Sequence, residues 1–266
     1  YQCMNLHTVF ATKNYCYTDL PNMSKVLGIM VHSTGCNNPN LRRYVGPDDG
    51  LLGPTSSANW NQRTINGKVQ KLGVHGFIGK LKDGTVATYQ VQKWNHKCYH
   101  CGVGTSGKSG NSNYIAFEIC EDDLTDEAYC KACYREAVEL CAYLCEMYKL
   151  NPLTNIVCHC EAYKKGFASN HADVMHWWKR FGLSMDQFRV DVKNEMEDNN
   201  MTDEKFAELM ERYYANQAKK TCPDWAKEEF EEAKQMGITD GSAPMRPATR
   251  LETALMTKRA IKSTNK

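Results

Sequence analysis

The stretch VHGFIGKLKDGTVATYQVQ (residues 74–92) contains two apolar, β-branched runs separated by Lys82-Asp83-Gly84. An Asp-Gly pair between two such runs is a strong signal for a β-hairpin, because both residue types tolerate the positive φ angles of tight hairpin turns. Three further apolar runs have the length of buried strands: VLGIMVH (26–32), YIAFEIC (114–120) and NIVCHC (155–160). The sequence therefore predicts a sheet that includes one antiparallel hairpin.

Helical patterns lie between and after these strands. Apolar residues between Ala137 and Tyr148 recur at three- and four-residue spacing, and Thr125 is the expected N-cap of that helix. A further helix is expected from Ser184. Strands that alternate with helices up to residue 197 indicate an α/β fold with a mixed central β-sheet flanked by helices.

Residues 198–266 have a different composition, which is strongly charged and poor in β-branched residues. This composition favours a small all-α domain of two or three helices, with Gly237 and Gly241 as stops and Pro247 as a restart. We therefore expect two domains, 1–197 and 198–266.

The overall composition excludes several classes of protein. The 266 residues carry a net charge of +2 without an arginine-rich block, which gives no reason to expect a nucleic-acid partner. No apolar stretch is long enough to cross a bilayer, and the first residues do not resemble a signal peptide. The thirteen cysteines are therefore expected to be reduced thiols, many of them buried.

Two histidines end predicted strands, His32 in VLGIMVH and His159 in IVCH. Side chains at the ends of adjacent strands can converge, and a third ligand from the loop after His159 would complete an open zinc site. His171 is the first candidate for that ligand, and Asp173 is the alternative.

Six short motifs in this order resemble a known family. They are VHST (31–34), HGFI (75–78), Asp83-Gly84, YHCG (99–102), AFE (116–118) and CHCE (158–161). Together they are similar to zinc-dependent N-acetylmuramoyl-L-alanine amidases of the amidase-2 type, which are related to peptidoglycan recognition proteins and phage endolysins. The resemblance covers roughly residues 20–195.

The resemblance implies roles for particular residues. Zinc would be held by His32, His159 and His171, and Glu118 would be the general base for the zinc-bound water. The family commonly has a lysine two residues before its third ligand, where this chain has Ser169, so Lys165 or its neighbour Lys164 would substitute. The usual Pro-Gly after that ligand is replaced by Ala172-Asp173, which keeps Asp173 open as the ligand.

Substrate-binding positions follow from the same resemblance. His75 and His100 match positions near the substrate groove, and each could equally be a structural hydrogen-bonding residue. Trp60 lies in a long Asn-, Pro- and Gly-rich loop where a glycopeptide could bind.

The cysteine pairs Cys98-x-x-Cys101 and Cys130-x-x-Cys133 have the spacing of a four-thiolate zinc site. Against a second metal, the latter pair falls inside the start of a predicted helix, and a core strand separates the two pairs.

Residues 225–261 resemble a single S-layer homology repeat, through Trp225, Gly237-Ile238, Asp240-Gly241, Pro247 and Thr249-Arg250-x-Glu252. The resemblance implies binding of a secondary cell-wall polymer or homo-oligomerisation. The alternative is a helical interaction tail.

These observations predict a peptidoglycan hydrolase that cleaves the amide between N-acetylmuramic acid and L-alanine. We expect a phage or prophage endolysin of a Gram-positive host, held in the host cytoplasm until lysis and then active on the cell wall. The alternative is a non-catalytic peptidoglycan-binding relative of the same fold.

Overall fold

The computed structural model describes residues 4–199 and 202–264. The contacts divide the chain into two compact units, Tyr1–Asn199 and Asn200–Lys266. Among the described residues, no helix is both long and apolar enough to span a bilayer.

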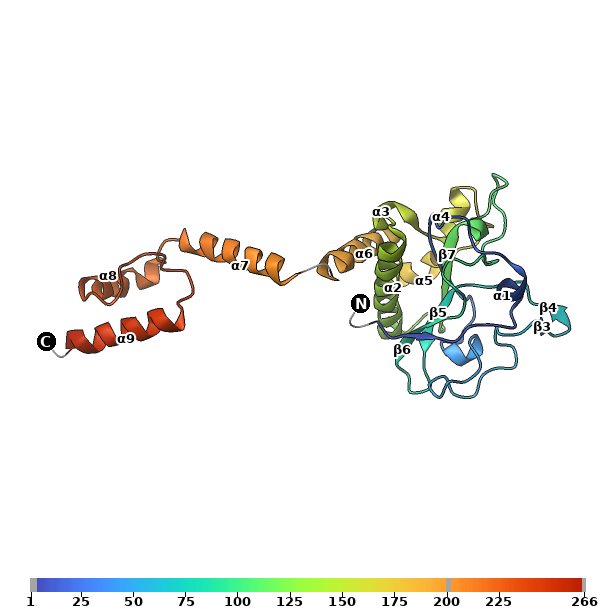
Figure 1. The fold of residues 1–266 in the computed structure, drawn as a ribbon, viewed down its shortest axis with the longest axis horizontal. Coiled ribbons are helices and arrows are strands. Elements are labelled where there is room, and N and C mark those ends of the chain that lie inside the picture. The colour runs from blue at the N-terminus through green and yellow to red at the C-terminus, as the bar shows by residue number, and fades with distance from the viewer. Residues whose placement is uncertain (1–3, 200–201, 265–266) are drawn as a thin grey trace. The chain divides into compact units, whose positions relative to one another are not determined.

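The first unit is built on a six-stranded sheet with the strand order β1-β6-β5-β7-β2-β8 (Figure 1). Strands β5 and β6 are antiparallel, and every other neighbouring pair is parallel. The predicted α/β fold with a mixed sheet is therefore confirmed. The strands are β1 (Leu6–Thr8), β2 (Gly28–Ser33), β5 (Gly76–Lys80), β6 (Val86–Gln90), β7 (Tyr114–Ile119) and β8 (Ile156–Cys158), with a separate pair β3 (Thr64–Ile65) and β4 (Lys68–Val69).

The predicted hairpin is present as β5 and β6. Gly84 has φ +88°, a left-handed conformation that favours glycine. The Asp83 carboxylate accepts hydrogen bonds from the backbone N–H of Thr85 at 2.9 Å and from its hydroxyl at 2.7 Å. The turn is thus fixed by the two residues that predicted it.

Helices cover one face of the sheet. Alternate residues of β2 and β7, among them Val31 and Phe117, pack against α2 (Glu127–Tyr148), and α6 (Met185–Asn199) lies beside α2 (Figure 1). The N-cap of α2 is Asp126, which accepts from the Tyr129 N–H at 2.9 Å, so the prediction of Thr125 as the cap is wrong by one residue. The Thr125 hydroxyl instead donates to Asp123.

The opposite face of the sheet is covered by loops and holds the other alternate residues, including Met30, Phe77, Ala116 and Cys120. Because side chains alternate along a strand, His32 lies on the face of Met30 and Glu118 on the face of Ala116. His32 and Glu118 are also register partners on neighbouring parallel strands. The sheet therefore places both residues side by side on its loop-covered face.

The last strand is shorter than the sequence suggests. β8 ends at Cys158, and His159 is the first residue of α4 (His159–Lys164). The chain turns here because the Glu161 carboxylate accepts from the Cys158 N–H at 3.1 Å and pairs with Arg189 at 3.0 Å. Cys160 therefore lies in the helix and not on a strand. Its sulfur lies 3.3 Å from that of Cys158.

The remaining helices of the first unit are short. They are α1 (Tyr15–Asp19), α3 (Pro152–Asn155) and α5 (Met175–Trp178), with single 3-10 turns η1 (Leu41–Arg43), η2 (Gly110–Ser112) and η3 (Lys179–Phe181). Helix α5 buries Trp177 and Trp178 completely in the core beneath α2 and α6.

The second unit contains α7 (Asp203–Ala218), η4 (Asp224–Ala226), α8 (Lys227–Gln235) and α9 (Arg250–Thr264). None of the three α-helices has a buried residue. Thr249 and Glu252 form a reciprocal capping box at α9, with Glu252 accepting from the Thr249 N–H at 2.7 Å and Thr249 Oγ1 accepting from the Glu252 N–H at 3.1 Å. The T-R-x-E motif thus has a structural role at a helix start.

We expect a chain that ends at residue 199 to fold as the full chain does, because the buried hydrophobic clusters found among the described residues all lie in the first unit. The predicted boundary after 197 falls inside α6, which continues to Asn199. Thermal unfolding by circular dichroism should give nearly the same midpoint for both chains. A chain that ends at residue 184 is the control, since it removes the buried Phe188 and Val192 and should unfold at a clearly lower temperature. Insolubility of the longer truncation would contradict this expectation.

Candidate active site

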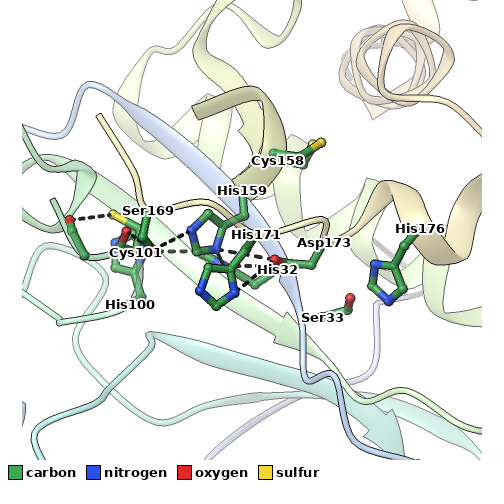
Figure 2. Close-up of polar contacts among 12 residues, drawn as sticks. His32, Ser33, His100, Cys101, Cys158, His159, Ser169, His171, Asp173 and His176 are labelled. Carbon is green, nitrogen blue, oxygen red and sulfur yellow. Dashed lines mark hydrogen bonds and ion pairs between the residues drawn. The ribbon is translucent and has the colours of Figure 1, made fainter. Parts of the chain in front are cut away.

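Three polar side chains converge at the edge of the loop-covered face: His32 near the end of β2, His159 at the start of α4, and Asp173 in the segment before α5 (Figure 2). The His32 Nδ1 atom lies 3.1 Å from Asp173 Oδ2 and 3.1 Å from His159 Nδ1, and His159 Nδ1 lies 3.5 Å from Asp173 Oδ1. All three residues are buried. Among the described residues, this is the one group of His, Cys, Asp or Glu with the proximity of a metal site.

The spacing of these atoms fits zinc. A tetrahedral ion with bonds of about 2.0–2.1 Å needs ligand atoms about 3.3–3.4 Å apart. The two Nδ1 atoms are 3.1 Å apart, and each lies 3.1–3.5 Å from one of the two Asp173 carboxylate oxygens, so the group is close to the size that a zinc ion needs. Two imidazoles and a carboxylate are also a ligand set that leaves a fourth position for water or substrate.

The third member of the group is Asp173, not His171. The His171 Nδ1 atom lies 4.0 Å from Asp173 Oδ1, and the His171 side chain is 60% exposed. Its ring stacks on His159 at 4.5 Å, so it sits at the rim of the group. Asp173 is held inward because its carbonyl accepts from the Cys160 N–H at 3.0 Å, at the start of α4. The geometry therefore favours the alternative ligand that the sequence left open.

Charge also suits a cation at this point. Burial alone would raise the pKa of Asp173, but the adjacent His159 and His32 side chains hold it well below its usual range. Burial lowers the pKa of His32, an effect that Asp173 partly opposes. Asp173 is thus an anion and His32 a neutral imidazole, the forms that bind metal.

Glu118 lies beside His32 in register on β7. Its Oε2 atom is buried and has no hydrogen-bond partner among the described residues. Burial raises the pKa of Glu118 well above its ordinary value, and the nearby Asp173 and Glu121 raise it further. A buried carboxyl group with a raised pKa beside the converging side chains is placed to take up and release a proton, as a general acid–base residue must.

The two histidines predicted to bind substrate have different surroundings. The Nδ1 atom of His75 accepts from the Ala116 N–H at 2.9 Å and its Nε2 donates to the His96 carbonyl at 2.7 Å, while burial lowers its pKa to about 4. Both ring nitrogens are used, so His75 is a structural residue of the core. His100 instead lies beside the group, with its Nδ1 atom 3.0 Å from His32 Nε2.

The other predicted residues lie farther from the converging atoms. Lys164 and Lys165 are exposed at the end of α4, whose opposite end carries His159. Six helical residues span about 9 Å, so the Lys165 backbone is well separated from the group. Trp60 packs edge-on against Phe77 at 5.2 Å and contributes to the loop-covered core.

The four-thiolate site does not form. Cys98 lies in the loop segment beside Cys16, and Cys101 packs in a small cluster with Met30. Cys130 and Cys133 are on α2, in the core on the other side of the sheet. The sheet therefore separates the two pairs.

A neighbouring cluster was not anticipated from the sequence. Buried Glu121 accepts from Ser33 Oγ at 2.5 Å and lies 2.9 Å from His176 Nε2. The sequence shows Glu121 only as the first of three consecutive acidic residues, a pattern typical of a solvated loop. The one available signal is that Glu121 directly follows the buried β7 run.

This pair predicts a pH-dependent contribution to stability. The hydrogen bond to Glu121 raises the pKa of His176. A raised pKa means that the stabilisation is fully present below the unfolded value of about 6.5 and is lost as pH rises through the folded value. The melting temperature of His176→Gln should therefore lie below that of the unmodified chain in acid and approach it in alkali. A difference that is constant across this range would contradict the assignment.

Residues 22–174, more than half of the chain, match the family model described as N-acetylmuramoyl-L-alanine amidase. The chain belongs to this family. The resemblance stated from the short motifs is thereby confirmed, and the chain is an N-acetylmuramoyl-L-alanine amidase, a peptidoglycan hydrolase. A comparison with curated proteins finds no match.

Several solved structures are similar to the amidase. Staphylococcus aureus hydrolase AmiA, determined with its ligand, has 16% identity and a TM-score of 0.48 over 73% of this chain and 82% of its own. The PlyG catalytic domain has 20% identity and a TM-score of 0.47 over 73% and 96%. A mutant endolysin from Bacillus subtilis has 21% identity and a TM-score of 0.41 over 71% and 99%.

Proposed function

We propose that the enzyme is a zinc amidase whose metal is held by His32, His159 and Asp173. The observation that carries this proposal is the convergence of these three buried residues, each of which offers one ligand atom within 4.8 Å of the other two. Zinc, when bound, lowers the pKa of water and polarises a carbonyl oxygen, and both effects assist hydrolysis of an amide.

Glu118 supplies the proton transfers. It lies on the same face of the sheet as His32, and its buried Oε2 atom has no partner within residues 4–199 and 202–264. We assign it to accept the proton of the attacking water and to deliver it to the amine of the departing L-alanine. The environment that raises the pKa of Glu118 suits both proton transfers, because the proton that Glu118 takes from the water must also be released to the amine.

His171 is the proposed second catalytic residue, in place of Lys165. It is exposed at the rim and stacks on His159, where a bound substrate would contact it. A ring N–H at this position can donate a hydrogen bond to the amide oxygen as negative charge develops there.

The biological setting is proposed to be that of a phage or prophage endolysin of a Gram-positive host. The enzyme would remain in the host cytoplasm until lysis and then act on the cell wall. The second unit would bind a secondary cell-wall polymer or assemble into a homo-oligomer. A cavity of about 620 Å³ in that unit, lined by Phe230, Ile238, Arg246 and Arg259 among others, supports a polymer-binding role.

Cleavage of a soluble muropeptide tests the chemistry. The expected products are a muramic acid whose lactyl carboxylate is free and a peptide with a new L-alanine amino terminus. Both are identifiable by mass spectrometry. Chelation should abolish cleavage and stoichiometric zinc should restore it. Cleavage at a glycosidic or peptide bond, or full activity of metal-free protein, would overturn the proposal.

A further inference from the structure

The two histidines of the converging group present the same ring atom to its centre. The Nδ1 atoms of His32 and His159 both lie close to Asp173, while Nε2 of His32 contacts His100 and Nε2 of His159 contacts Ser169. A neutral imidazole has a lone pair on one nitrogen and a hydrogen on the other. Nδ1 can therefore bind a metal only if Nε2 carries the hydrogen, and the groups that contact Nε2 decide whether it does.

Ser169 provides the contact for His159. The Ser169 hydroxyl donates its single hydrogen to the Cys101 carbonyl at 3.0 Å. With that hydrogen on the carbonyl, the Ser169 oxygen can accept from His159 Nε2, which lies 3.3 Å away. In this arrangement His159 carries its hydrogen on Nε2, which leaves the Nδ1 lone pair directed at the group.

His100 provides the contact for His32, with 3.0 Å between His100 Nδ1 and His32 Nε2. A single hydrogen can occupy this contact in two ways. If His100 donates, the hydrogen of His32 sits on Nδ1 and faces Asp173, which blocks a metal. If His32 donates, its Nδ1 lone pair is free. Metal binding thus requires His100 Nδ1 to be the acceptor.

The contacts made by His100 and by Ser169 are both tied to the chain segment that contains His100 and Cys101. The Asn111 side-chain oxygen accepts from the backbone N–H groups of His100 at 2.9 Å and Cys101 at 3.0 Å. The Ser169 N–H donates to the Cys101 carbonyl at 2.8 Å. Gly102 has φ +64°, and a Cβ there would lie 3.1 Å from Ser169 Oγ, so the close approach of this segment to Ser169 depends on glycine.

We infer that His100 and Ser169 are positioning residues that hold His32 and His159 in the Nε2–H form and so aim both Nδ1 atoms at one cation. The inference rests on the proposed zinc site. It adds the residues outside the ligand set that determine how tightly a divalent metal is held. Outer partners of metal-binding histidines typically change metal affinity by about 10–100-fold when they are removed.

Two removals and two conservative replacements test the inference in the full chain. Ser169→Ala and His100→Phe remove the acceptors, and each should weaken zinc binding about 10–100-fold in competition with a chromogenic chelator. Ser169→Thr retains a hydroxyl, and His100→Asn retains an acceptor near the Nδ1 position, so both should bind nearly as tightly as the unmodified chain. His7→Phe, on the edge strand β1, is the matched control for loss of an imidazole.

A spectroscopic reading separates positioning from a general structural effect. Long-range proton–nitrogen NMR correlations of the zinc-loaded protein should show a hydrogen on Nε2 of His32 and of His159, and metal-free melting temperatures should agree among the variants. Unchanged zinc affinity in both removal variants, or a hydrogen on Nδ1 of either ligand with zinc bound, would overturn the inference while the zinc proposal stands. An unmodified chain that binds no zinc would overturn both.

Discussion

Asp173→Ala will lose bound metal and fall to background cleavage, whereas His171→Ala will keep the metal and lose only part of its rate. The difference follows from geometry, since Asp173 lies 3.1 Å from His32 Nδ1, while His171 is 60% exposed at the rim. An open zinc site needs three protein ligands, so removal of one leaves two histidines that hold zinc weakly. The rate of His171→Ala should fall by about 10²–10³-fold, the usual effect of removing one hydrogen-bond donor to a developing negative charge. Zinc content by atomic absorption and muropeptide turnover measure the two effects.

A rescue variant guards against simple misfolding. Asp173→Cys supplies a thiolate, which is also a zinc ligand, and should retain metal while the alanine variant does not. If His171→Ala loses its metal and Asp173→Ala retains it, then His171 is the ligand and the rim position of its ring does not describe the metal-bound enzyme.

Glu118→Gln should reduce turnover by about 10²–10⁴-fold with zinc content unchanged. The substitution keeps the shape of the side chain and removes its ability to accept a proton. The buried Oε2 of Glu118 has no partner to lose, so the melting temperature should not fall. Steady-state cleavage of a soluble muropeptide, together with zinc content, gives the rate and the occupancy.

Glu136→Gln is the matched control for loss of a buried carboxyl group. Glu136 is on α2 and accepts from the Thr88 hydroxyl at 2.7 Å, on the far side of the sheet from the converging group. Its substitution should alter stability and leave turnover nearly unchanged. Normal turnover of Glu118→Gln would assign the proton transfer to another residue, and loss of zinc would make Glu118 part of the metal site.

Periodicity made much of this fold predictable. Alternation along YIAFEI places Glu118 on the same face as Ala116, and His32 near the end of β2 meets His159, which directly follows β8, as expected. The Asp-Gly turn fixed the hairpin because its chemistry is local. These features depend on residues close in sequence or on strand ends that any parallel sheet aligns.

The third member of the converging group and the surroundings of His75 and His100 could not be obtained in this way. The segment between α4 and α5 has no repeat to show which side chain points inward, and Asp173 is held by a backbone contact with Cys160. His75 and His100 stand in similar sequence surroundings, and only tertiary contacts separate them. Both ring nitrogens of His75 form hydrogen bonds with the backbone, whereas the ring of His100 contacts His32.

The in-register pairing of His32 with Glu118 has a practical consequence for protein engineering. Neighbouring strands lie about 4.8 Å apart, and a shift of one residue would turn both side chains to the opposite face. The spacing between the His32 and Glu118 side chains is therefore set by the sheet and cannot be tuned by small changes. Attempts to alter which cell walls the enzyme attacks should vary the loops over this face, such as residues 35–62, and leave strands β2 and β7 untouched.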